Sequence, residues 1–208
     1  MVLMEERVKI ARIAELNKGF LVIFEDGSEL RLSEEVYFTC SVYEKEEMSQ
    51  EDINKLLFKE QVTEGLIICK KYLAGGLKPK RRLFAYMENK GIEKPVAEQV
   101  VDILEADNYL DDFKYALKRA KRKMIVSPLS SVMLVDYLEN EGLERDTAEK
   151  AVKQYNIDDF ATASKLAAKK LKQSKGNKRK TALFLASKGF DEETIIEVLG
   201  MEGVWNAL

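Results

Sequence analysis

A short pattern that occurs three times along the chain constrains its fold more than any other feature. Each copy has an aromatic residue, an apolar residue, two or three polar residues, a glycine and a further apolar residue, and the copies are Tyr86–Ile92, Tyr137–Leu143 and Phe184–Phe190. A glycine after a polar last turn is a common end of an α-helix, because glycine enters the left-handed conformation at little cost. The three glycines lie 51 and then 47 residues apart, which predicts repeated helical units of that length.

A second element repeats with the same 47-residue shift. The segments Asp111–Ala120 and Asp158–Ala167 each open with two aspartates and a phenylalanine. Acidic residues are favoured at the positive end of a helix, so each pair indicates a helix start. Paired carboxylates could also act as metal ligands or acid–base groups. Adjacent residues point in different directions on a helix, so a cap is the favoured interpretation.

These patterns predict three units of three helices each. We place the units at residues 51–109, 110–157 and 158–208, with Trp205 packed in the last one and Ser49 opening the capping pattern of the first helix. A unit of this size buries its own apolar face poorly. Neighbouring units are therefore expected to stack into an elongated, curved array.

Residues 1–48 are predicted to form a β-rich extension. Val8–Ile13 alternates apolar and charged residues, Phe20–Phe24 is β-branched and aromatic, and Leu30–Leu32 alternates again. An Asp-Gly turn between the second and third segments suits a hairpin, and the segment up to Tyr43 is a candidate for a further strand. The expected fold class is mainly α: three three-helix repeats behind a small N-terminal antiparallel β-rich extension.

The composition excludes several classes of enzyme. Among 208 residues there is no histidine, which removes Ser-His-Asp and Cys-His catalysis and His-ligated zinc. The two cysteines, Cys40 and Cys69, supply neither a disulfide framework nor a metal cage, and no phosphate-binding glycine loop occurs. We expect a protein that is not an enzyme, with no catalytic, cofactor-binding or metal-binding residues. Apolar runs such as Leu66–Cys69 are too short to span a bilayer and no signal peptide is evident, so a cytoplasmic protein without membrane contact is expected.

The charge is nearly balanced overall but is divided along the chain. The whole sequence has 34 basic and 36 acidic residues, a formal net charge of −2. Residues 1–69 hold 8 basic and 15 acidic residues, whereas residues 70–208 hold 26 and 21. The helical part is therefore basic, and the balanced total does not exclude a polyanion as its partner.

The basic residues gather at equivalent places, namely the end of the first helix of a unit and the loop into its second helix. Lysines that merely solvate helix ends are an alternative for any one cluster, because the helix dipole favours cations there. Three clusters at equivalent positions favour a polyanion or an acidic protein surface as the binding partner. Contacts of such lysines and arginines with phosphates do not depend on base sequence and weaken with salt. The residues predicted to make these contacts are Lys80, Arg81, Arg82, Lys114, Lys118, Arg119, Lys121, Arg122, Lys123, Lys165, Lys169, Lys170, Lys172, Lys178, Arg179 and Lys180.

Several of these segments resemble the RecX family of bacterial recombination regulators. The resemblance rests on the three-helix units with Lys90-Gly91-Ile92, Tyr109–Ala116 followed by a basic helix end, and Lys188-Gly189-Phe190. It covers roughly residues 51–208, and Tyr109–Ala116 is its most specific part. The β-rich start is similar to the extension of longer family members.

The resemblance implies a non-enzymatic regulator that binds the RecA recombinase and its nucleoprotein filament. Such a protein inhibits recombinase activity and so modulates DNA repair, recombination and the SOS response. We expect a monomer whose basic residues contact the filament and, weakly and with salt sensitivity, single- and double-stranded DNA. Two alternatives remain open: a helical DNA-binding transcriptional regulator, and a non-enzymatic scaffold for protein interactions.

Overall fold

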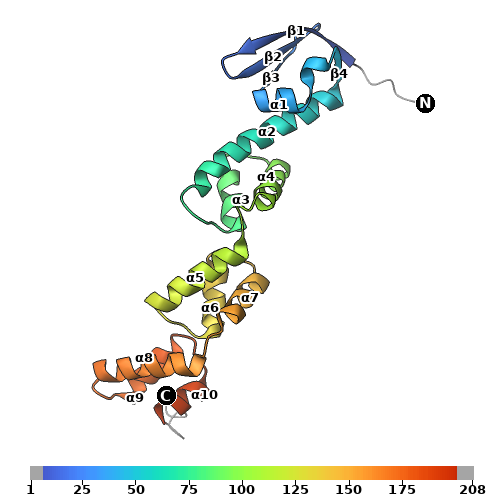
Figure 1. The fold of residues 1–208 in the computed structure, drawn as a ribbon. Helices are drawn as coiled ribbons and strands as arrows, with labels where there is room; N and C mark the ends of the chain where they lie inside the picture. The colour runs from blue at the N-terminus through green and yellow to red at the C-terminus, as the bar shows by residue number, and fades with distance from the viewer. Residues whose placement is uncertain (1–6, 201–208) are drawn as a thin grey trace, which may run out of the picture. The chain divides into compact units, whose positions relative to one another are not determined.

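The computed structural model describes residues 7–200 of the chain, so Trp205 lies outside the described residues. Four strands and a short helix precede the long helices (Figure 1). The elements up to the first long helix are β1 (Arg7–Leu16), β2 (Gly19–Phe24), β3 (Glu29–Leu32), α1 (Glu34–Thr39), the 3₁₀ turn η1 (Val42–Glu44) and β4 (Glu47–Ser49). The remaining elements are α2 (Gln50–Leu73), α3 (Lys80–Glu88), α4 (Lys94–Ala106), α5 (Asp112–Val126), α6 (Ser131–Asn140), α7 (Arg145–Tyr155), α8 (Asp159–Gln173), α9 (Lys178–Ala186) and α10 (Glu192–Leu199).

The strands form one antiparallel sheet in the order β3-β2-β1-β4. The Asp-Gly turn joins β2 to β3 as expected. Buried residues of the sheet pack together with residues of α1, η1 and the beginning of α2, and these core residues are Val22, Phe24, Leu30, Leu32, Val36, Val42, Met48 and Leu56. The sheet is thus stabilised by helices on one side, which a small sheet needs.

The expectation of a strand in the segment up to Tyr43 is wrong. This segment forms α1 and η1, and the fourth strand lies later, at Glu47–Ser49. The hydroxyl of Ser33 accepts a hydrogen bond from the amide of Val36, and two glutamates occupy the first turn of α1. A capped start with acidic residues at the positive end of the helix outweighs the β-propensity of the apolar residues that follow.

The cap predicted at Ser49 is confirmed. Its side chain accepts from the amide of Asp52, whose carboxylate in turn accepts from the amide of Ser49, a complete capping box at the start of α2. Further along α2, Gly65 faces α4 so closely that an added Cβ would lie 2.9 Å from a methyl of Val100. Glycine therefore permits the close packing of α2 on α4.

Residue contacts divide the chain into two compact units. The first contains the residues up to Gly76 together with Leu83–Tyr109, and the second contains Leu77–Arg82 and the residues from Leu110 on. In the second unit, α5, α6 and α7 pack around one apolar core and α8, α9 and α10 around another. The fold is mainly α with a small N-terminal antiparallel sheet, as predicted, while the repeat boundaries at 51–109, 110–157 and 158–208 stay predictions.

The paired aspartates each have two structural tasks. The first of each pair caps its own helix: Asp111 accepts from the amide of Lys114 at 2.7 Å, and Asp158 from that of Ala161 at 2.8 Å. The second of each pair accepts from the first amide of an earlier helix. Asp112 binds the amide of Lys80 at the start of α3, and Asp159 binds the amide and hydroxyl of Ser131 at the start of α6. Sequence reasoning found the caps but not the second task.

Candidate nucleic-acid interface

The exposed side of α5 carries a row of cations. Lys114, Lys118 and Arg122 are exposed and share one face at i, i+4 spacing, with Lys121 exposed beside them. The opposite side of α5 contributes to the core of the second unit. Lys123 lies in the last turn, where the helix dipole favours a cation, so its position has a simple structural explanation.

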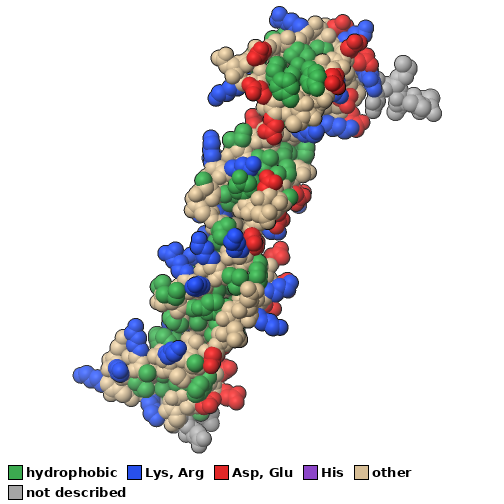
Figure 2. Space-filling view, in the orientation of Figure 1, with side chains coloured by type: hydrophobic (Ala, Val, Ile, Leu, Met, Phe, Trp, Pro, Cys, Tyr) green, Lys and Arg blue, Asp and Glu red, His purple; other side chains and the backbone are tan. Residues whose placement is uncertain are grey.

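A corresponding row lies on α8. Lys165, Lys169 and Lys172 are exposed at i, i+4, i+7 spacing. Lys165 and Lys169 occupy the positions that Lys118 and Arg122 hold one repeat earlier. Figure 2 shows lysine and arginine side chains projecting from this part of the molecule. The same face of the first helix is therefore basic in two successive repeats.

Basic triplets also begin α3 and α9, where helix electrostatics disfavour them. The first turn of α3 contains Lys80–Arg82 and that of α9 contains Lys178–Lys180, and neither first turn has an acidic residue. The positive end of the helix dipole raises the energy of a cation there, whereas it stabilises a bound anion. Stabilisation of their own helix starts therefore cannot account for these two triplets, although Arg82 pairs with Glu141 and the ammonium of Lys178 donates to the carbonyl of Gly200 at the end of α10.

Two of the predicted contact residues belong to an internal polar network around Glu141. Arg119 binds the carboxylate of Glu141 at 2.5 Å and donates to the hydroxyl of Tyr137 at 2.7 Å. Arg82 binds the same carboxylate at 3.1 Å, and Tyr115 donates to it at 3.0 Å. Burial acts to raise the pKa of Glu141, but hydrogen bonds from Arg119 and Tyr115 outweigh it and leave that pKa below its usual value. The structure gives Arg119 a packing role, and a binding role for it stays a prediction.

Two further lysines cover aromatic rings at equivalent positions of successive repeats. Lys123 lies 4.5 Å from the ring centre of Tyr137, and Lys170 lies 5.0 Å from that of Phe184. In the first unit the equivalent ring, Tyr86, is stacked on Tyr72 with 4.1 Å between ring centres. These aromatics begin the threefold pattern of the sequence. Because their faces are covered from within the chain, they are not open platforms for stacking bases.

A groove of about 630 Å³ lies beside the α8 row, bordered by the ends of α5 and α7. Its lining combines apolar residues with Lys165 and Lys169. Ile125 and Val126, at the end of α5, are 72% and 76% exposed at its edge. Sequence reasoning missed this pair, although two β-branched residues between a basic run and Ser-Pro were a visible signal.

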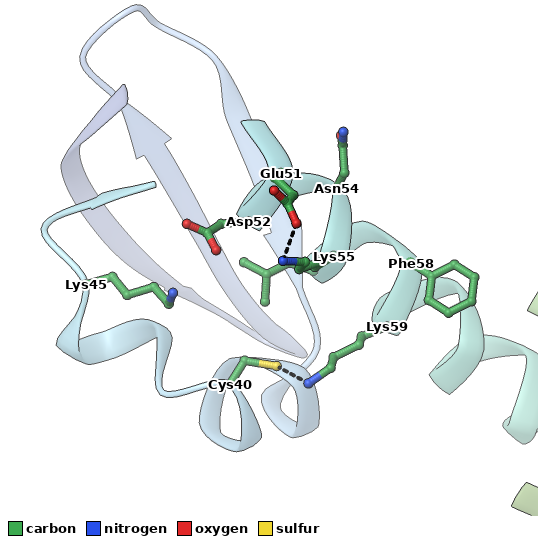
Figure 3. Close-up of a pocket in the computed structure, with 9 residues that line it drawn as sticks. Cys40, Lys45, Glu51, Asp52, Asn54, Lys55, Phe58 and Lys59 are labelled. Carbon is green, nitrogen blue, oxygen red and sulfur yellow. Dashed lines mark hydrogen bonds and ion pairs between the residues drawn. The ribbon is translucent and has the colours of Figure 1, made fainter. Parts of the chain in front are cut away.

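A second hollow, of about 530 Å³, lies between α1 and the start of α2 (Figure 3). Its charges are mixed: Lys55 pairs with Glu51 at 2.5 Å, and the ammonium of Lys59 donates to the Cys40 sulfur at 3.3 Å. The other cysteine, Cys69, is buried, and burial raises its pKa to about 11. A thiol with so high a pKa is a poor nucleophile at neutral pH.

Within residues 7–200, no three His, Cys, Asp or Glu side chains are grouped in a way that could hold a metal ion. None of the helices described there is long and apolar enough to cross a membrane.

Comparison with known proteins gives a consistent result. A family model described as the third three-helix domain of RecX matches residues 157–199. Regulatory protein RecX of Enterococcus faecalis is 26% identical over 194 residues, covering 89% of this chain and 73% of that protein. Regulatory protein RecX of Leuconostoc mesenteroides is also 26% identical, over 165 residues that cover 76% of this chain and 62% of that protein.

Solved structures share the fold. A crystal structure of regulatory protein RecX superimposes with a TM-score of 0.72 at 16% identity, covering 94% of this chain and 100% of the other. The structure of RecX from Lactobacillus salivarius gives a TM-score of 0.62 at 18% identity over 68% of this chain. Together, the matching third domain, the RecX relatives and the shared fold support the assignment of this chain to the RecX family.

Proposed function

We propose that this chain is a regulator that binds the RecA recombinase and its nucleoprotein filament and inhibits recombinase activity. The observation that carries this proposal is the placement of basic triplets at the starts of α3 and α9, where they cost helix stability. Exposed cations on α5 and α8 extend the same basic character over two repeats. The relatives bear the name of regulatory protein rather than that of an enzyme, which supports a regulatory role.

The proposed contacts are electrostatic and therefore independent of base sequence. Cations that reach phosphates release counterions, so affinity for DNA falls steeply with salt. Single- and double-stranded DNA are both expected to bind weakly, with the recombinase supplying the rest of the affinity. The proposal includes action as a monomer in the cytoplasm, without catalysis or a cofactor.

The test is RecA-dependent ATP hydrolysis on single-stranded DNA while this protein is titrated in. We expect the rate to fall as the protein approaches the amount of RecA. A triple reversal, Lys178→Glu with Arg179→Glu and Lys180→Glu, should shift the inhibition to at least about tenfold higher concentration, because it replaces attraction by repulsion. The matched control reverses three exposed lysines outside the clusters, Lys18→Glu with Lys94→Glu and Lys153→Glu.

Two outcomes would contradict the proposal. One is an ATPase rate unchanged at stoichiometric protein. The other is an equal loss of inhibition in the triplet variant and the control, which would make net charge rather than position the cause. If selection from random duplexes instead yields one defined DNA motif, the transcriptional regulator becomes the better interpretation.

A further inference from the structure

An aromatic cluster lies partly exposed on the N-terminal module, which we define as residues 7–49. Phe20 stacks on Tyr37 with 3.7 Å between ring centres, and Phe38 meets both rings edge-on at 5.5 and 5.2 Å. Tyr43 lies 6.2 Å from both Tyr37 and Phe38. Phe38 is 57% exposed and Tyr43 is 53% exposed, although aromatic rings of this size are usually well covered.

The exposed rings are held in place by the backbone and by the rings beneath them. Tyr37 is buried and stacks on Phe20 of the sheet, so it fixes the base of the cluster. Ser41 joins α1 to η1 in the left-handed conformation, with φ 47° and ψ 42°. A residue other than glycine keeps this conformation only where its surroundings enforce it. Rings fixed in advance lose little conformational entropy when a partner binds.

Glutamates surround the exposed rings. Glu34 and Glu35 precede Phe38 by four and three residues on α1, and Glu44 follows Tyr43 directly. Within the described residues these three glutamates form no ion pair. Between residues 34 and 47 there are five glutamates and a single basic residue, Lys45. Figure 2 shows apolar side chains gathered on this module with acidic side chains at their border.

We propose that this acidic aromatic patch, formed by Phe38, Tyr43, Glu34, Glu35 and Glu44, docks a short basic polypeptide segment of another protein. The segment would place one or two apolar side chains against the rings and lysine or arginine beside the glutamates. Cations also bind favourably over aromatic faces. Elsewhere this chain places its own lysines over rings, as Lys90 over Tyr86 and Lys123 over Tyr137. Among residues 7–200 no cation covers Phe38 or Tyr43, so those ring faces remain available to a partner.

The size of the patch selects a segment rather than a second copy of the chain. Phe38 and Tyr43 each expose about half of their surface, which amounts to roughly 200 Å² in total for rings of this kind. A stable dimer needs about 800 Å² on each partner. A segment anchored by one or two side chains needs far less. Nucleic acid is disfavoured because its phosphates would meet glutamates.

The probe for this test is a fluorescein-labelled peptide of about 12 residues in which lysines and arginines flank two leucines. Its binding to the whole chain is followed by fluorescence anisotropy. We expect a rise in Kd of at least about tenfold for Phe38→Ala with Tyr43→Ala, because the apolar anchor site is lost. Glu44→Lys, which lies outside α1, should weaken binding in the same direction without disturbing that helix.

Two controls isolate the patch from general effects. Phe160→Ala removes another ring that is 45% exposed, on α8, and Glu64→Lys with Asp102→Lys reverses two exposed carboxylates in the first unit. Both controls should keep the Kd within about twofold of the original value. A peptide with glutamate in place of each lysine and arginine should not bind.

Three results would overturn the proposal. They are equal Kd values for the patch variants and the controls, no binding of the basic peptide at about millimolar concentration, and tighter binding of the acidic peptide. Sedimentation of the whole chain provides a further check on the occupant. A dimer that dissociates when Phe38 and Tyr43 are replaced would assign the patch to a second copy and refute the proposed segment.

Discussion

Replacement of Gly189 by alanine tests whether the repeats depend on one close approach. Gly189 has φ +84°, and a Cβ built on it would lie 2.6 Å from both the Cβ of Met133 and the hydroxyl oxygen of Ser130. Real contacts of Cβ atoms are not that short. The backbone cannot easily withdraw, because the amide of Ser130 donates to the carbonyl of Lys188 at 3.0 Å, directly beside the glycine.

Two costs add up at this position. A residue other than glycine in the left-handed region loses about 1–2 kcal/mol. Forcing an extra methyl group into a packed site costs about 1–3 kcal/mol more. The expected loss of unfolding free energy is therefore about 2–5 kcal/mol, which corresponds to a fall in Tm of roughly 10 °C or more for a unit of about 100 residues.

The assay is urea and thermal unfolding followed by circular dichroism, with two matched controls at equivalent positions. Gly142 has φ +104°, but its nearest neighbour to an added Cβ is a side-chain carbon of Pro79 at 3.5 Å, an ordinary contact. Gly91 has φ +75° and nothing within 4 Å. Gly142→Ala and Gly91→Ala should therefore lose only the conformational part, about 1–2 kcal/mol.

The reasoning fails if Gly189→Ala destabilises the protein no more than Gly142→Ala does. A double-mutant cycle with Met133→Ala adds a second check, because it removes the Met133 sulfur, which would lie 3.3 Å from the new methyl group, while the Cβ of residue 133 and the hydroxyl of Ser130 stay in place. We expect Gly189→Ala to cost less in that background by about 1 kcal/mol. Strict additivity would show that the part of the Met133 side chain beyond its Cβ does not contribute to the clash.

Three further predictions concern single contacts. Asp159→Ala should lower the unfolding free energy by about 1–3 kcal/mol, measured by urea unfolding, because it leaves the half-buried first amide of α6, at Ser131, without its acceptor. Hydrogen bonds in the folded chain hold the pKa of Glu141 below its ordinary value of 4.5. The ionised carboxylate therefore stabilises the fold above pH 4.5, and this stabilisation is lost as the pH falls below that value. The urea midpoint of Glu141→Gln should consequently fall less on acidification than that of the original chain. Iodoacetamide at neutral pH should alkylate Cys40 before Cys69, as peptide mass spectrometry would show, because Cys69 is buried and its pKa is raised to about 11.

The sequence predicts the parts of this fold that depend on local chemistry. Strand alternation, the capping box at Ser49 and glycine after a polar turn each act through neighbouring residues, and the structure contains all three. The helix at Glu34–Thr39 was missed because its apolar residues suit a strand equally well, and Ser33 with two glutamates decides between them.

Long-range partners could not be predicted in the same way. Arg119 looks like any exposed cation of a basic helix, and only the folded chain brings Glu141 to it from 22 residues away. The exposure of Phe38 and Tyr43 likewise depends on how η1 follows α1. Burial and pairing across the sequence therefore separate the cations that hold the fold from those that remain available for binding.

The unequal repeat lengths of 51 and 47 residues have a structural explanation in the joints between repeats. From Asp111 to Gly142 and from Asp158 to Gly189 the distance along the chain is 31 residues in both cases. In the earlier segment, Asp112 and Gly142 both lie against the start of α3, at residues 79–82. In the later segment, Asp159 and Gly189 both lie against the start of α6, at residues 130–133. Because both contacts must be made together, their spacing is fixed. The difference of four residues falls instead between Gly91 and Asp111, where α4 has 13 residues against 11 in α7 and the link after it is longer. An insertion placed in that link should therefore be tolerated, whereas the same insertion between Asp158 and Gly189 should separate the two contacts and unfold the last repeat.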